Sequence, residues 1–221
     1  MAPPHGRTRS QRALHYRHLS SRYSTVHLVF DIFQGIGIAA AVGIRPFLPA
    51  LAAGALAAGD VEIDFNGTHY SFLEHVPFLL VLLILAIALA VAERRMPPER
   101  LARGTLGAAL ALAAMALGAL FFAGALADDH YAAWPGWIGG VVCAAVAIAA
   151  TRPLLARVRG RLDRATAATV PIYTEGSAAL LAVLSVVAPP VGPIALAGLL
   201  WLLIAGRRRE GQKYAGLRIL R

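Results

Sequence analysis

Long stretches without a charged residue are the feature that most limits how this chain can fold. Residues 76–92 and 104–127 are uncharged, largely apolar runs of 17 and 24 residues. As an α-helix, a run of this length spans the roughly 30 Å hydrocarbon core of a bilayer. The mean hydropathy of +0.63 and the 58% of hydrophobic residues also differ from a soluble domain. The sequence therefore predicts an all-α integral membrane protein.

The distribution of basic residues predicts the number of crossings. The apolar runs give spans at 26–44, 76–92, 104–127, 134–151, 171–188 and 191–206. Arginine and lysine occur in the N-terminal arm, in the links 93–103 and 152–169 and in the tail, whereas the links 59–73 and 128–133 have none. Because Lys and Arg stay in the cytoplasm, we expect about six spans with both termini cytoplasmic. That topology puts 20 of the 21 basic residues on one side.

The same pattern divides the chain into three regions and indicates its surroundings. We predict a flexible basic cytoplasmic arm over 1–25, a membrane domain over 26–206 and a basic cytoplasmic tail over 207–221. The net charge of +9 does not indicate a nucleic-acid partner, because the basic residues lie in short clusters between apolar runs. The expected location is the cell membrane, and the expected partners are the bilayer, anionic headgroups at the cytoplasmic face and a small solute or ion.

Two proline-containing stretches interrupt the apolar pattern. Pro189-Pro190 lies midway through a stretch too long for one crossing, so it predicts a tight helical hairpin. The segment 47–59 is apolar but has only 13 residues, and it comes directly after Arg45-Pro46. A run that short is typical of a re-entrant or interfacial segment. The alternative is one span over about 35–57 with Arg45 near its centre.

The first outer link carries the pattern of a β-hairpin. Apolar and polar residues alternate on both sides of Asn66-Gly67. Asn-Gly accepts the positive φ angles of a type I′ turn, so it joins antiparallel strands tightly. The pattern predicts a small extracellular hairpin in which Ile63 pairs with Tyr70.

The two halves of the chain suggest a duplication. In each half a span ends at Arg-Pro (Arg45-Pro46 and Arg152-Pro153), and a short segment then leads to a glutamate, Glu74 or Glu175, that opens the next span. The repeats would cover 26–127 and 134–206. Three crossings per half make the halves enter from opposite faces, which is the inverted repeat of many secondary transporters.

Two stretches carry a resemblance to a known family. They are Gly37-Ile-Ala-Ala-Ala-Val-Gly-Ile-Arg-Pro-Phe-Leu-Pro49 and the closing Tyr214-Ala-Gly-Leu-Arg-Ile-Leu-Arg221. Over about residues 35–221 the chain resembles a bacterial membrane family filed as domain of unknown function 4126. Gly43, Arg45, Phe47, Leu48 and Pro49 match its early motif, although Pro46 replaces a small or aromatic residue. The resemblance implies a membrane protein and no particular activity.

Charged residues near or within the spans are the candidate functional residues. Arg45 is the one basic residue expected away from the cytoplasmic side. A guanidinium in the membrane costs about 3 kcal/mol or more, so it requires a partner or a wet cavity. The repeat predicts the pairs Arg45–Glu74 and Arg152–Glu175 at matched depths, as gates or as structural ion pairs. Asp31 is a candidate proton or cation site, or a carboxylate that reaches water at the cytoplasmic edge.

The remaining patterns do not indicate catalysis. Histidine and carboxylate residues near the outer link have no standard metal-ligand spacing, and nucleotide-binding or nucleophile motifs are missing. We therefore expect no metal and no cofactor. The leading hypothesis is a small-solute or ion transporter or channel. The alternatives are a membrane scaffold or partner subunit, and an enzyme that acts on a lipid-linked substrate; a polar cavity between the halves would favour transport.

Overall fold

The fold is described from a computed structural model, which describes residues 9–96, 104–128, 131–167 and 169–215. All regular elements in these ranges are helical. They are α1 (Arg9–Ile44), α2 (Phe47–Ala57), the 3-10 turn η1 (Ser71–Leu73), α3 (Val76–Arg95), α5 (Gly104–Asp128), α6 (Trp134–Arg159), α7 (Arg164–Ala167), α8 (Val170–Val187) and α9 (Val191–Ala215). Within the described ranges, six helices are long and apolar enough to cross a membrane. The prediction of an all-α fold with six apolar spans is confirmed.

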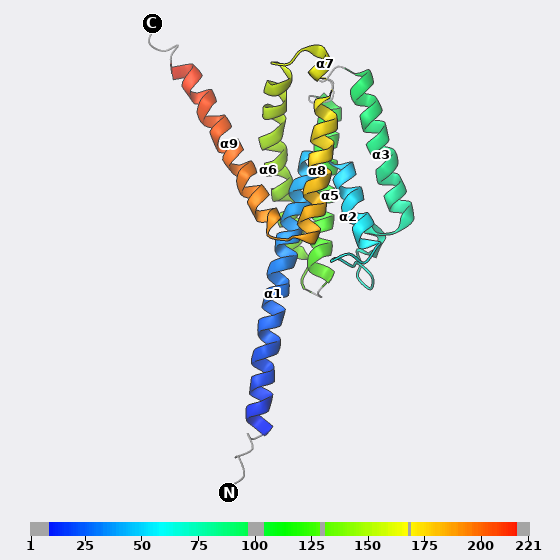
Figure 1. The fold of residues 1–221 in the computed structure, drawn as a ribbon, viewed down its shortest axis with the longest axis vertical. Coiled ribbons are helices and arrows are strands. Elements are labelled where there is room, and N and C mark those ends of the chain that lie inside the picture. The colour runs from blue at the N-terminus through cyan, green and yellow to red at the C-terminus, as the bar shows by residue number, and fades with distance from the viewer. Residues whose placement is uncertain (1–8, 97–103, 129–130, 168, 216–221) are drawn as a thin grey trace.

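Helix α1 forms the centre of the bundle. It packs against α2, α5, α6, α8 and α9, whereas α3 packs chiefly on α2 (Figure 1). The chain reverses between α8 and α9 at Pro189-Pro190, as predicted. Because α1 is central, the point where it ends determines how the following helices run.

The short helix α2 adds one reversal to the path of the chain through the bundle. It leads back from the end of α1 to the link 58–75, so α1, α2 and α3 alternate in direction (Figure 1). As a result α1 and α9 run the same way, and their outer ends lie at opposite ends of the bundle. This differs from the expectation that both termini share one side. That expectation required the segment 47–59 not to cross the bundle.

Helices extend into both of the predicted terminal regions. α1 is helical from Arg9, so most of the predicted flexible arm continues the first span. α9 likewise extends to Ala215, into the predicted tail. Residues 1–8 and 216–221, which include most of the closing stretch of the family resemblance, lie outside the described residues.

Helices α1 and α6 also run in parallel, which argues against the predicted inverted repeat. Along α1, Gly35 lies against Phe122, which also contacts Gly139 at the start of α6. Gly43 lies against Ala144, further along α6. Helices α1 and α6 open the two predicted repeats, and inverted repeats would require them to be antiparallel. In addition, α6 continues through Pro153 to Arg159, so the second Arg-Pro does not end a helix.

The link 58–75 is compact but contains no strand. The chain turns at Asn66-Gly67, where Thr68 N donates to Phe65 O and Gly67 has a φ of +77°. The flanking segments do not pair; instead Ile63 and Phe65 are buried in the core. Burial of these apolar side chains against the helices replaces the cross-strand pairing that the alternation predicted.

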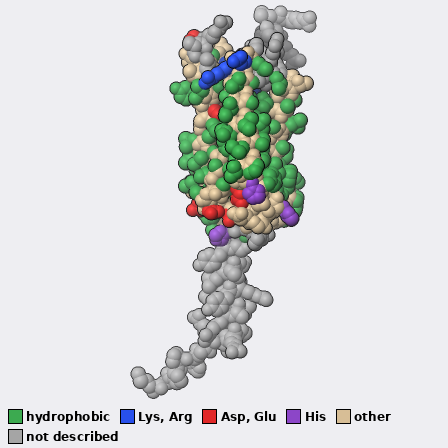
Figure 2. Space-filling view, turned by 90° about the vertical axis from the view of Figure 1, so that its right-hand side faces the viewer, with side chains coloured by type: hydrophobic (Ala, Val, Ile, Leu, Met, Phe, Trp, Pro, Cys, Tyr) green, Lys and Arg blue, Asp and Glu red, His purple; other side chains and the backbone are tan. Residues whose placement is uncertain are grey.

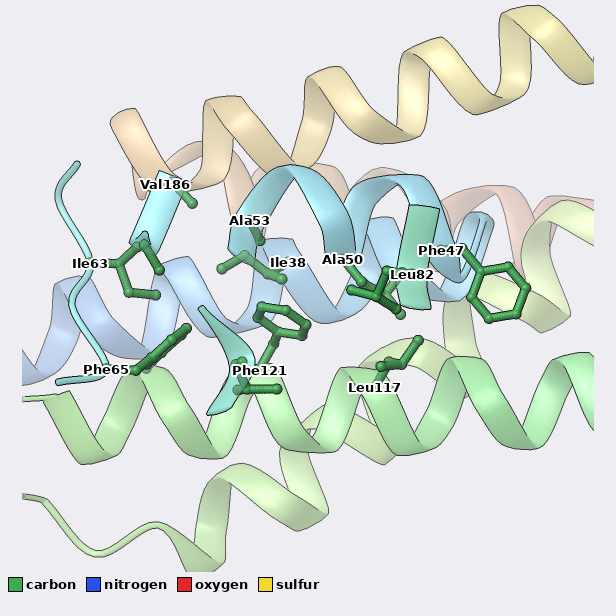
Figure 3. Packing of buried hydrophobic residues seen from close by; sticks show 14 of the residues in the cluster. Ile38, Phe47, Ala50, Ala53, Ile63, Phe65, Leu82, Leu117, Phe121 and Val186 are labelled. Atoms are coloured by element: carbon green, nitrogen blue, oxygen red, sulfur yellow. The ribbon is translucent and has the colours of Figure 1, made fainter. Parts of the chain in front are cut away.

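The core surrounds α2. Ile38 from α1, Ala50 and Ala53 from α2, and Phe121 from α5 meet there (Figure 3). The ring centroids of Phe65 and Phe121 are 6.1 Å apart in an edge-to-face arrangement. In a bilayer, helix association depends on such close packing rather than on exclusion of water.

Small residues let the central helices approach closely. A Cβ at Gly140 of α6 would overlap the carbonyl oxygen of Gly118 in α5, and one at Gly192 would overlap Phe33 O in α1. Neither position leaves room for a side chain. These contacts fix α5, α6 and α9 around α1.

The surface matches a membrane-embedded body. Figure 2 shows a broad hydrophobic band on the visible face, with acidic and histidine side chains at one end and basic side chains at the other. We call these the acidic end and the basic end. The acidic end carries the link 58–75; the basic end carries the last residues of α3 and α6, including Arg94 and Arg157.

Candidate functional site

A break between two helices positions the candidate site. Helix α1 stops at Ile44, and α2 begins at Phe47 with Pro46 as its N-cap. Pro46 has no N–H to continue α1, and the residue before a proline avoids helical geometry. Arg45 therefore lies in the kink, and the first N–H groups of α2 have no partner within their own helix.

The break lies at membrane depth. Gly43 packs beside Ala144 and Ala147, which are near the middle of α6. Helix α6 continues from Ala147 to Arg159, a further rise of about 18 Å at 1.5 Å per residue. Figure 1 accordingly shows α1 ending below the upper ends of α3 and α6. Beyond the end of α1, side chains rather than helix backbone occupy this part of the bundle.

Arg45 holds two carboxylates in that space. Its Nη1 donates to Glu93 Oε1 of α3 at 2.6 Å, and its Nε lies 3.5 Å from Glu175 Oε2 of α8. The side chain of Arg45 is only 8% exposed, and those of Glu93 and Glu175 are 16% and 23% exposed. The three residues form a largely buried ion network that joins α3, α8 and the α1–α2 break.

Two further groups complete this network. The backbone N–H of Leu48, in the first turn of α2, donates to the Glu175 carboxylate. Glu175 therefore accepts a hydrogen bond at a helix N-terminus and forms an ion pair with a guanidinium, and both stabilise its negative charge. Arg159 of α6 interacts electrostatically with Glu93 and Arg45. We call Arg45, Glu93, Arg159 and Glu175 the Arg45 network.

The Arg45 network is balanced in charge, with two arginines and two glutamates. Balance matters because an unpaired charge inside a membrane is costly. Arg159 Nε is nevertheless buried without a hydrogen-bond partner among the described residues. The charges of the network are thus balanced, but one N–H donor, that of Arg159 Nε, has no acceptor among the described residues.

The predicted pair Arg45–Glu74 is wrong. Glu74 lies in the link at the acidic end, where its Oε2 accepts from Phe65 N at 3.1 Å. Its Oε1 is buried and has no hydrogen-bond partner in the described part of the chain. Helix α2 separates Glu74 from Arg45, because the segment predicted to be re-entrant leads back through the bundle.

The predicted pair Arg152–Glu175 is also wrong. Arg152 is exposed on α6, and its Nη2 donates to Gly107 O of α5 at 2.8 Å. Glu175 instead faces Arg45. Arg45 and Glu175, which were predicted to belong to different pairs, form an ion pair with each other.

Asp31 lies in a second polar region near the acidic end. It is 14 residues before Arg45 on α1, a rise of about 21 Å along the helix. Gln34, one turn further on, is buried and donates from Nε2 to Glu62 O at 3.1 Å and to Val186 O at 3.4 Å. These bonds tie the link 58–75 to the end of α8.

Sequence reasoning missed Glu93 and Arg159 as site residues, because both lie beside basic links that are normally solvated. The buried stripe of α3 consists of Leu82 and Leu89, and Glu93 continues it at the spacing i, i+7, i+11. Since 76–92 is uniformly apolar, no sequence signal marked this stripe. For metal binding, no group of three or more His, Cys, Asp or Glu occurs among the residues with described positions.

Comparison with protein-family models gave no match, and comparisons with curated proteins and with solved structures also gave none. The resemblance to the domain of unknown function family stays a prediction. Any functional conclusion therefore depends on the geometry of the Arg45 network.

Proposed function

We propose that this protein is a small-solute or ion carrier or channel of the cell membrane, and that the Arg45 network is the gate that closes its path at the basic end. The observation that supports this most is the broken helix. Arg45 lies at membrane depth, between the end of α1 and the N-terminus of α2, and it binds carboxylates from two further helices. Discontinuous helices with charged residues at the break are typical of transporter binding and gating regions.

The form of the closure supports this assignment. At the basic end, Arg45 joins α3 to α8 through Glu93 and Glu175. At the acidic end, Gln34 joins the link 58–75 to α8. Between these polar layers lies the packed apolar core around α2 (Figure 3). Such an arrangement corresponds to a closed state in which opening requires α2 or α3 to move.

Helix α3 is suited to such a movement. It packs chiefly on α2, and Leu82 and Leu89 are its buried residues. Release of Glu93 from Arg45 would remove the polar tie that holds its basic end. A weakly packed element held by one ion pair is the kind of two-state element that a gate requires.

The charge distribution supports an orientation with the basic end in the cytoplasm. The links 93–103 and 152–169 and the tail carry most of the arginines, and the opposite links 59–73 and 128–133 carry none. In this orientation the C-terminus is cytoplasmic, and α1, whose N-terminal part carries Arg9, Arg12, Arg17 and Arg22, begins on the other side. Arg45 then belongs with the cytoplasmic half, where the positive-inside rule favours it.

The test is ion flux through reconstituted protein. The variants are Glu93→Gln, Glu175→Gln and their double, which keep side-chain shape but remove the charges that hold Arg45. Glu62→Gln is the matched control, because Glu62 is exposed at the acidic end. We expect the double variant in liposomes to raise voltage-driven leak of K⁺ or Cl⁻ at least about tenfold over the control, which corresponds to about 1.4 kcal/mol.

The outcome separates the gate from a structural role. A folded double variant, monodisperse in detergent, that leaks no more than Glu62→Gln would contradict the proposal. In that case the packed core and the balanced network would favour a non-transporting scaffold or partner subunit. If the double variant does not fold, each single variant provides the same comparison.

A further inference from the structure

The early end of α1 leaves a groove on the side of α6 and α8, near the basic end. Its floor is Ile44, the last residue of α1, and its walls include Thr151 and Leu154 of α6 and Thr174 and Ser177 of α8. The groove has a volume of about 440 Å³ and is open to the surface. That volume falls within the roughly 300–1,000 Å³ of ligand-binding clefts.

The depth of the groove places its mouth against lipid. Thr151 and Ser177 lie within membrane-spanning stretches of α6 and α8, not in the links. Helices α6 and α8 both pack on α1 but have few contacts with each other. A cleft between them at this depth is bordered by hydrocarbon rather than by water.

The chemistry of the lining selects an apolar occupant. The hydroxyls of Thr151, Thr174 and Ser177 donate to carbonyl oxygens of their own helices, those of Ala147, Val170 and Thr174. Their hydrogens are therefore committed. Apart from the hydroxyl of Tyr173, which also lines the groove, a polar solute would find few donors here, whereas Ile44, Leu154 and Leu155 offer apolar contact to a hydrocarbon chain.

Basic side chains of α6 and α9 stand near the basic end. Arg157 comes three residues after Leu154, so the two are neighbours on one face of α6. The Arg157 guanidinium lies beside Gly206 of α9, where a Cβ would be 3.3 Å from Nη2, and the exposed Arg207 is the next residue. These arginines lie where lipid phosphates lie, at the level of the basic-end interface.

We propose that this groove binds an anionic phospholipid, with one acyl chain between α6 and α8 and its phosphate at Arg157. The acyl chain fits the apolar lining, and the headgroup fits the adjacent positive charge. The site is separate from the Arg45 network, because Ser177 and Glu175 project from different faces of α8. The inference therefore does not depend on transport.

The experiment is native mass spectrometry of the full chain in mild detergent, offered phosphatidylglycerol and phosphatidylcholine of identical acyl chains. Ser177→Trp fills the groove. Ile172→Trp is its control, because Ile172 is exposed on another face of α8 and does not line the groove. We expect one tightly retained phosphatidylglycerol in the wild type and in the control, and about tenfold less in Ser177→Trp.

A second pair of variants tests the headgroup. Arg157→Gln should reduce phosphatidylglycerol retention about fivefold and leave phosphatidylcholine unchanged, since one interfacial arginine attracts an anionic lipid by about that factor. Arg94→Gln, an exposed arginine at the end of α3, should change neither. Equal retention in Ser177→Trp and Ile172→Trp, or no preference for phosphatidylglycerol over phosphatidylcholine, would overturn the proposal. If Ser177→Trp does not fold, Ser177→Leu replaces it.

Discussion

The chain contains the dipeptide Arg-Pro twice within apolar helical sequence, with opposite results. At Arg45-Pro46 the helix ends, the chain reverses into α2, and the arginine is buried in an ion network. At Arg152-Pro153 helix α6 continues to Arg159, and the arginine is exposed. Each proline removes one backbone donor, so the local cost is similar. The difference lies in the burial available to the residues after each proline.

After Pro46 the chain can bury its next residues. Phe47, Pro49 and Ala50 of α2 are buried in the core among α1, α3 and α8. After Pro153, Leu154 and Leu155 are only half buried, beside the open groove. A reversal at Pro153 would gain little burial, so α6 remains continuous. A proline permits a break, and tertiary packing decides whether it occurs.

The two sites should differ most in the stability that is lost when the arginine is replaced. Arg45→Ala leaves Glu93 and Glu175 buried without their partner, and removal of one member of a buried ion pair costs about 3–5 kcal/mol. Arg152→Ala removes one bond from an exposed side chain and should cost about 1 kcal/mol or less. Reversible unfolding in mixed micelles measures both. Equal losses would mean that the Arg45 network contributes no special stability.

A smaller effect tests which glutamate each arginine pairs with. A double-mutant cycle for Arg45→Ala and Glu175→Gln should give a coupling of about 0.5–3 kcal/mol, because the residues share one network. The corresponding cycle for Arg152→Ala and Glu175→Gln should be additive within about 0.5 kcal/mol. Coupling in the second cycle and not in the first would restore the pairing expected from the repeat. The measurement is the same unfolding assay.

The sequence predicted the helices well because apolar runs are a direct consequence of bilayer thickness. The spans at 104–127 and 191–206 begin where α5 and α9 begin. It did not predict the path of 47–57, since an 11-residue helix is too short for the length rule. The relative direction of the two halves depends on that one segment.

The candidate site was predicted only in part for a related reason. Arg45 and Glu175 stand out because they are charges within apolar sequence, and both belong to the Arg45 network. Their partners depend on helix order and rotation, which uniformly apolar helices do not encode. Glu93 could be recognised only once α3 was seen to bury the stripe of Leu82 and Leu89.

The smallest effects are expected at the prolines. Pro153→Ala supplies an N–H to Ala149 O in the middle of a continuous helix, so it should leave stability unchanged or raise it by up to about 1 kcal/mol. Pro46→Ala introduces a buried N–H at a helix break, where continuation of α1 would displace α2, and it should lower stability by about 1 kcal/mol. Unfolding midpoints of the two alanine variants, measured side by side, give the comparison. Opposite signs would support the view that packing beyond each proline decides the break; a gain at Pro46 would mean that proline itself imposes it.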